Sequence, residues 1–214
     1  MDKVFNQLVQ LDWADIDNVR RVTTKALDEL TRPAVVRELL NNVVEDQRLL
    51  DLSERRHWGD RVILFDDPGS GVRLRLHRFE QATDLPHSHR WGFTTRVLAG
   101  RYRNWLYGPE KWVNQSVEQN HVLPSAAMVR DETPGVSYTI DDQMVHNVRM
   151  DANTFSLIVR GPSDKERALR VRRDGSVYWQ YGREKETAEA VEEVRTSEHR
   201  LREVLELAER AGVA

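Results

Sequence analysis

Pro86-His87-Ser88-His89-Arg90-Trp91-Gly92-Phe93 is the stretch that decides how this 214-residue chain should fold. Two histidines two positions apart lie on the same face of a strand, because side chains alternate with a period of two. If that face is concave, both imidazoles can reach one metal ion, and a third ligand must come from another strand. His146 is the best placed of the remaining histidines, because it lies inside the later strand-like run Met144-Val145-His146-Asn147-Val148. The sequence therefore predicts His87, His89 and His146 as metal ligands.

This prediction has a geometric condition. A metal–nitrogen bond is about 2 Å long, so the ring of His146 must lie within roughly 6 Å of the other two rings. All three must also point to one place inside a closed sheet.

Composition narrows the class of protein. The chain is 39% hydrophobic, which suits one medium-sized domain with a real core. Its net charge is −3, from 32 basic and 35 acidic residues, so we expect no nucleic-acid partner. Cysteine is absent, which excludes a disulfide framework and leaves nitrogen and oxygen ligands for any metal.

The sequence contains neither a signal-peptide core nor a long apolar run. The first thirty residues lack an apolar h-region, and no run of about 18 apolar residues could span a bilayer. We therefore expect a cytoplasmic protein with a small-molecule substrate and no membrane partner.

The two ends of the chain have helical patterns. Residues 1–58 are predicted as a helical extension packed on the central domain, with Asp15 or Asp17 as one N-cap and Pro33 as the first residue of a second helix. Residues 183–214 are predicted as a C-terminal helix. Its apolar stripe could dock on the central domain or on a second copy in a homodimer.

The central residues 59–182 are predicted as many short strands. Turn residues such as Gly100 and the pair Pro134-Gly135 separate them, which is typical of a sandwich or barrel. The expected strands are 61–65, 72–79, 88–99, 101–107, 113–122, 136–140, 146–150, 153–160, 168–173 and 176–181.

The central stretch resembles the cupins, small β-barrel proteins whose first motif runs Gly-x5-His-x-His-x3,4-Glu-x6-Gly. His87 and His89 match the two histidines, Gly100 matches the last glycine, and Phe93 stands where the glutamate ligand would be. His146 matches the histidine of the second motif. The resemblance implies a single jelly-roll barrel, a double-stranded β-helix, with helices at both ends.

A three-histidine cupin without the glutamate resembles the cysteine-dioxygenase-like branch, the thiol dioxygenases. In that branch an arginine at the position of Arg61 binds the substrate carboxylate. Its Ser-x-His-x-Tyr relay is here Ser156-Leu157-Ile158-Val159-Arg160, so Arg160 replaces the tyrosine. The resemblance implies Fe(II) as the favoured ion, and Ni, Zn and Mn are alternatives because geometry and supply decide more than affinity.

Several residues are predicted to surround the metal. Arg61 and Arg160 could bind a carboxylate or phosphate through the guanidinium fork. Trp91 and Phe93 share the parity of the two histidines and should line the pocket, and Tyr102 could donate a proton. Arg73 and Arg75 alternate with leucines, so we expect them to face outward.

Three functions remain open. The favoured hypothesis is a mononuclear non-haem Fe(II) dioxygenase that acts on a small acidic metabolite, with Tyr102 and Arg160 as catalytic residues. The second is a metal-dependent lyase, isomerase or hydrolase that does not use O2. The third is a ligand-binding module without catalysis.

Overall fold

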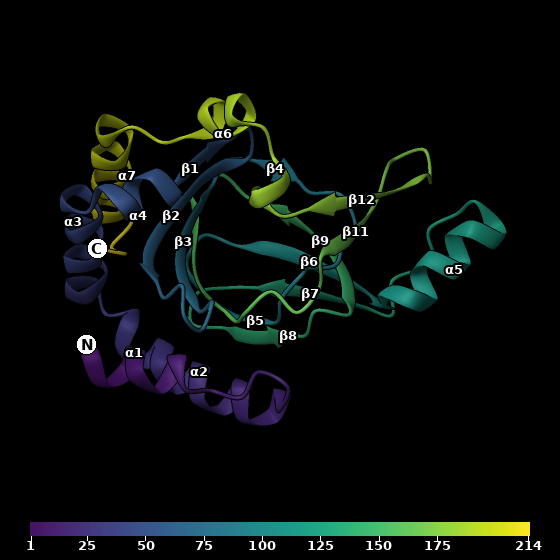
Figure 1. Cartoon of the computed structure of the whole chain (residues 1–214), viewed down its shortest axis with the longest axis horizontal. Helices are drawn as coiled ribbons and strands as arrows, with labels where there is room; N and C mark the ends of the chain where they lie inside the picture. Colours follow the sequence, from purple (N-terminus) through teal and green to yellow (C-terminus); the bar gives the residue numbers. More distant parts are fainter.

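Two antiparallel sheets face each other in the computed structural model, which describes residues 1–214 (Figure 1). The first sheet has the order β1-β2-β3-β10-β5-β8, and the second has the order β4-β9-β6-β7. A separate two-stranded sheet contains β11 and β12. The strands are β1 (Glu54–Arg56), β2 (Gly59–Asp66), β3 (Arg73–Phe79), β4 (Ala82–Thr83), β5 (Phe93–Ala99), β6 (Tyr102–Pro109), β7 (Met128–Glu132), β8 (Ser137–Ile140), β9 (Met144–Met150), β10 (Thr154–Arg160), β11 (Arg167–Val171) and β12 (Val177–Tyr181).

Helices flank these sheets at both ends of the chain. The helices are α1 (Asp2–Val9), α2 (Ile16–Leu30), α3 (Pro33–Glu45), α4 (Gln47–Leu52), α5 (Glu110–Asn120), α6 (Ala188–Val194) and α7 (Glu198–Arg210), with a 3-10 turn at Arg183–Lys185. The mainly β architecture with terminal helices is consistent with a cupin-like β-barrel, so the predicted fold class is confirmed. No helix has both the length and the apolar character needed to cross a membrane.

The main apolar core lies outside the space between the two sheets. Helices α1 to α4 and α7 cover the outer face of the six-stranded sheet (Figure 1). Leu74 and Leu76 of β3 and Phe155 and Leu157 of β10 point toward these helices, and each is at most 1% exposed. Because side chains alternate along a strand, the residues between them must point into the space between the sheets.

Two capping features follow the sequence prediction. The Asp15 side chain accepts a hydrogen bond from the Asn18 backbone N–H at 3.1 Å and so begins α2, and Pro33 begins α3.

Gly100 has φ +75°, and a Cβ there would lie 2.5 Å from Oγ1 of Thr154. The turn after β5 therefore requires glycine, which explains the last residue of the motif.

The structure corrects four predictions of secondary structure. Residues 113–122 are not a strand, because Val113 and Val117 lie one helical turn apart and are both buried on α5. The predicted strand 88–99 begins only at Phe93. Strands β1, β4 and β7 were not predicted, and β1 lies within the predicted helical extension. The single C-terminal helix is two helices, because Thr187 and Ser197 each cap a new start, at α6 and α7.

Candidate metal centre

The segment that contains the first two histidines connects separate parts of the sheet structure. The His87 N–H donates to the His146 carbonyl at 2.8 Å, and the His146 N–H donates to the His87 carbonyl at 2.9 Å. On the other side, the Ser88 N–H donates to the Leu169 carbonyl at 3.0 Å. The segment therefore lies between β9 and β11, and this pairing fixes His87 beside the third histidine.

The three imidazole rings converge. The possible ligand atoms of His87, His89 and His146 all lie within 4.8 Å of one another, and Nε2 of His89 is 2.9 Å from Nε2 of His146. The ring of His146 lies 4.9 Å from that of His87 and 5.1 Å from that of His89, measured between centroids. The geometric condition derived from the metal–nitrogen bond length is met.

Two of the rings are oriented by oxygen acceptors on the side away from the convergence point. Nδ1 of His87 is 2.7 Å from the Leu85 carbonyl, and Nδ1 of His146 is 3.1 Å from Oδ1 of Asn104. An oxygen acceptor requires hydrogen on Nδ1, which leaves the Nε2 lone pair free. Carbonyl or carboxylate partners of this kind normally orient histidine ligands in metal sites.

The donor set fits a divalent transition-metal ion. Burial lowers the pKa of all three imidazoles, so each is neutral and able to ligate at neutral pH. Three neutral nitrogens suit Fe, Ni, Zn or Mn in the divalent state. These residues therefore form a group that could bind a metal ion.

Ser88, between the two histidines, is held on the opposite side of the segment. Its hydroxyl hydrogen-bonds to Glu110 and accepts from the Leu169 N–H at 3.0 Å. Lys165 donates to the same Glu110 carboxylate at 2.7 Å. This bracket of Ser88, Glu110 and Lys165 fixes the backbone between His87 and His89, and the sequence analysis did not identify it because its members are far apart in sequence.

Aromatic rings form a wall beside the histidines. The His89 ring centroid lies 4.6 Å from the Trp91 ring and 4.9 Å from the Phe93 ring, and Phe93 also lies 6.0 Å from His146. The structure thus places both predicted pocket residues next to the candidate ligands. Phe93 brings an apolar face to the position where the cupin motif has a carboxylate.

The arginines of this region differ from the prediction in one respect. Arg75 does not face outward: it is 6% exposed and its guanidinium lies 4.9 Å from the Trp91 ring centroid. Arg73, two positions earlier on β3, lies on the same face and pairs with Asp66. On β3 the leucines, and not the arginines, point outward, because helices cover the outer face of the strand and make it apolar. Arg61 also lies on the inner side, paired with Glu54 at 3.0 Å. Arg160 is 7% exposed and lies 5.5 Å from the Trp91 centroid.

Tyr102 lies deeper between the sheets. It is paired with Met150 on β9, while Leu106 is paired with His146. Four residues of strand separate these positions, or about 13 Å along the strand. Burial raises the pKa of Tyr102 to about 12, and Tyr138 donates to its hydroxyl at 3.2 Å. Asn104, which the sequence analysis missed, is the β6 residue that contacts a candidate ligand.

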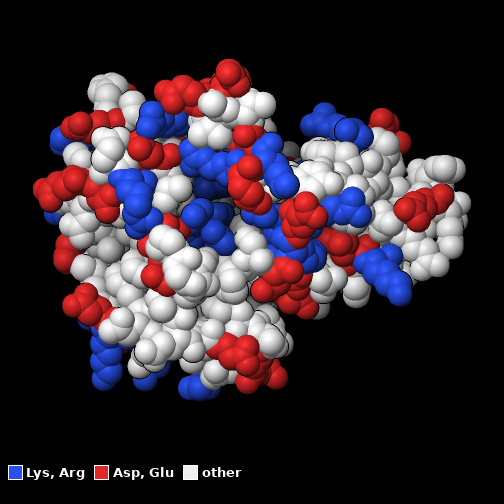
Figure 2. Space-filling model, in the orientation of Figure 1, with Lys and Arg blue, Asp and Glu red and all other residues white.

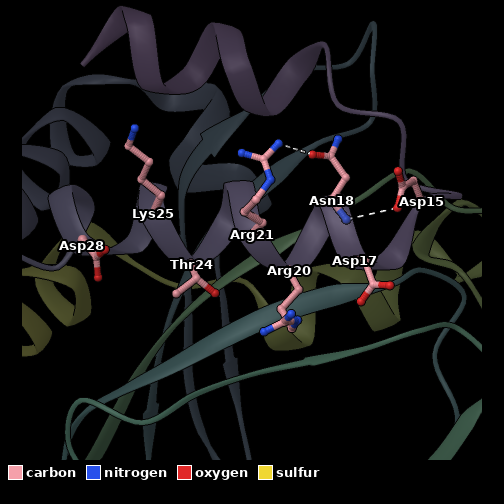
Figure 3. A pocket seen from close by; sticks show the side chains of 8 residues that line it. All are labelled: Asp15, Asp17, Asn18, Arg20, Arg21, Thr24, Lys25 and Asp28. Atoms are coloured by element: carbon pink, nitrogen blue, oxygen red, sulfur yellow. Dashed lines mark hydrogen bonds between the residues drawn. The ribbon is translucent and has the colours of Figure 1, made fainter.

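A shallow open site of about 710 Å³ lies along α2, and the histidines do not line it (Figure 3). Acidic, basic and neutral polar side chains line it, with no apolar residue, and Asn18 is hydrogen-bonded to Asp15 and Arg21. The lining residues are Asp15, Asp17, Asn18, Arg20, Arg21, Thr24, Lys25 and Asp28. It is an open helix surface without an arrangement suited to catalysis.

No family model matches the sequence, and no curated protein matches it. Solved structures with a partial likeness include ectoine synthase from P. lautus, at 14% identity and TM-score 0.42, covering 57% of this chain and 75% of that one. The polyketide cyclase RemF from Streptomyces resistomycificus has 16% identity and TM-score 0.40, covering 57% and 82%. KdgF from Halomonas sp. has 16% identity and TM-score 0.38, covering 50% and 82%. Function is therefore argued from the residues of the site.

Proposed function

We propose that this protein is a metal-dependent enzyme in which His87, His89 and His146 hold one divalent ion, most simply Fe(II). The observation that carries the proposal is the convergence of three imidazoles: buried His87 and His146, each with Nδ1 on an oxygen acceptor, and partly buried His89. Such orientation of two separate rings is typical of metal ligands and is not needed for ordinary packing.

The proposed reaction is the oxidation of a small acidic metabolite by O2. Iron(II) bound to three neutral nitrogens would supply the electrons that activate O2 and the Lewis acidity that attracts an anionic substrate. Three protein ligands leave other coordination positions open, as in non-haem iron oxygenases.

The surrounding residues have separate roles in this proposal. Trp91 and Phe93, whose rings lie beside His89, would exclude water from this side of the centre. Arg160, which has no acidic partner and lies 5.5 Å from the Trp91 ring centroid, orients the substrate through its charge and is a candidate catalytic cation. Arg61 remains a candidate for substrate binding, with one terminal nitrogen already held by Glu54. Tyr102 keeps its proton at neutral pH and would act as a donor only toward a substrate that extends between the sheets.

Elemental analysis of protein purified without added metal, followed by oxygen-uptake measurements with a panel of small carboxylates, tests the proposal. Iron at about one atom per chain, with O2 consumed only when substrate is present, is the expected result. Zinc or nickel with anaerobic turnover would instead support a lyase, isomerase or hydrolase. Full retention of function in a His87→Ala, His89→Ala double variant would favour a ligand-binding module and overturn the proposal.

A further inference from the structure

The inner face of β3 and β10 contains two buried arginines without an acidic partner. Arg75 is 6% exposed, no oxygen of the chain accepts a hydrogen bond from it, and its Nε is sealed from solvent. Arg160 is 7% exposed, its Nε also lacks a partner, and it donates only to the adjacent Gly161 carbonyl at 2.9 Å. A buried cation without a counter-charge is costly, so native proteins normally pair it.

Neighbouring arginines show how the chain normally compensates a positive charge held in this region. Arg61 is paired with Glu54, Arg73 with Asp66, and Arg170 with Asp84. Each of these three cations therefore has a carboxylate partner within the chain, although Glu54 and Asp66 also pair with other arginines. Arg75 and Arg160, which contact Trp91, are buried and have no such partner.

The two guanidinium groups are close enough to act together. Arg75 lies opposite Ile158, and Arg73 lies opposite Arg160, so Arg75 and Arg160 are diagonal neighbours on the same face of the β3–β10 pair. Both approach the Trp91 ring, at 4.9 Å and 5.5 Å from its centroid. The cation–π contacts compensate only part of the lost hydration.

This pair lies on the substrate side of the candidate metal centre. Trp91 contacts the arginines and also the His89 ring, whose centroid lies 4.6 Å away. Basic side chains gather in the middle of the face seen in Figure 2, where the surface is hollowed over the space between the sheets. An anion at the pair would thus lie one aromatic ring away from the imidazoles.

We propose that Arg75 and Arg160 together bind a doubly charged oxyanion of the substrate, either one phosphoryl-type group or two carboxylates. The inference rests on the proposed function in taking the three-histidine centre as the reacting end of the substrate. Two guanidinium groups offer several N–H donors and two positive charges, which a dianion neutralises and a single carboxylate does not. Neutral and singly charged molecules are therefore poor substrates.

Calorimetric titration of the metal-free full-length protein at pH 8 tests this proposal. The probes are inorganic phosphate and malonate, with acetate as the singly charged comparison at equal ionic strength. We expect phosphate or malonate to bind at least about tenfold more tightly than acetate, and the better of the two identifies the kind of dianion. Equal, weak binding of all three would overturn the proposal.

Variants locate the site. Arg75→Met and Arg160→Met keep most of each apolar stem and should each weaken binding of the dianion by about tenfold or more, and the double variant should abolish it. Arg103→Met is the matched control, because Arg103 is an exposed β6 arginine paired with Asp131 at 2.8 Å. Circular dichroism and the urea midpoint report folding of each variant. Unchanged binding in folded Arg75→Met and Arg160→Met proteins would contradict the assignment.

The test separates this inference from the proposed function. A chain that binds the dianion but holds no metal retains the anion site and loses the proposed reaction. A chain that holds iron and consumes O2, but has no preference for dianions, retains the reaction and loses the substrate class.

Discussion

The two faces of the six-stranded sheet use the same strands for opposite purposes. On β10, Phe155 and Leu157 pack under the helices, while the intervening Ser156 and, further along, Arg160 face the second sheet. On β3 the same alternation places Leu74 and Leu76 outside and Arg75 inside. The outer face therefore packs the main apolar core, whereas the inner face combines smaller apolar clusters with buried arginines, of which Arg75 has no acidic partner.

The largest effect is expected at the third histidine of the inner face. His146→Ala should lower metal affinity by more than about 100-fold, because loss of even an outer hydrogen-bonding partner typically costs 10–100-fold. Metal content after dialysis against a weak chelator is the measurement. His199→Ala is the control, because that side chain is 86% exposed on α7. Equal metal content in both variants would show that His146 is not a ligand.

A substitution on the outer face should affect stability and not metal binding. Phe155→Ala removes a fully buried ring from the core under the helices and should reduce the free energy of unfolding by about 3–5 kcal/mol. Urea denaturation measures this loss. Metal content per folded chain should stay as in the wild type, and a parallel fall would mean that the two faces are not independent.

The inner-face acid Glu54 should make stability dependent on pH. Burial favours the neutral form, but Arg61 and Arg56 outweigh it and hold the pKa of Glu54 at about 2, below its usual 4.5. A pKa lowered by folding stabilises the protein above pH 4.5, and this stability is lost as the pH falls toward 2. The difference corresponds to about 3 kcal/mol at about 1.36 kcal/mol per pKa unit.

Glu54→Gln tests this linkage. The variant should be less stable than the wild type at pH 7, and its stability should fall less between pH 4.5 and pH 2. Urea midpoints measured across that range provide the comparison. Parallel pH profiles for the two proteins would show that Glu54 does not carry the dependence.

The smallest expected effect is a difference in stability between two arginine variants, one on a helix that covers the outer face and one on the inner face. Arg200, on α7, donates from Nε and from one terminal nitrogen to the carboxylate of Asp60, each at 2.8 Å, and Asp60 is 1% exposed. Arg200→Met leaves this buried acid with weaker partners and should destabilise the protein by about 1–3 kcal/mol. Arg75→Met removes an uncompensated charge and should leave stability unchanged or raise it by about 1–2 kcal/mol. Urea midpoints that fall equally would remove the distinction between the two faces.

Sequence patterns predicted the fold and the histidines because both depend on short-range spacing. His87 and His89 share a face through strand parity, and Gly100 marks a turn that excludes a Cβ. Parity alone cannot say which face of a strand points between the sheets, and the error at Arg75 came from taking leucines as inward. That choice depends on whether helices cover the other face, which is a property of the whole chain.

Contacts between residues far apart in the chain could not be predicted from the sequence, for a related reason. Asn104 contacts His146 across the β6–β9 pair, and nothing local to Asn104 indicates this. The helix at 110–120 could have been recognised from Val113 and Val117, whose spacing of four fits a helical turn and not a strand. The end of α6 and start of α7 could likewise have been recognised from Ser197 as an N-cap.

Helix α5, which projects from the body of the molecule in Figure 1, begins at Glu110. The carboxylate of Glu110 accepts hydrogen bonds from the Ser88 hydroxyl and from Lys165 Nζ. The tilt of this helix and the separation of the first two imidazoles therefore share one anchor point. We expect a change at the first turn of α5 to alter the spacing of the two candidate ligands through the Ser88 hydroxyl, with His87 and His89 themselves unchanged.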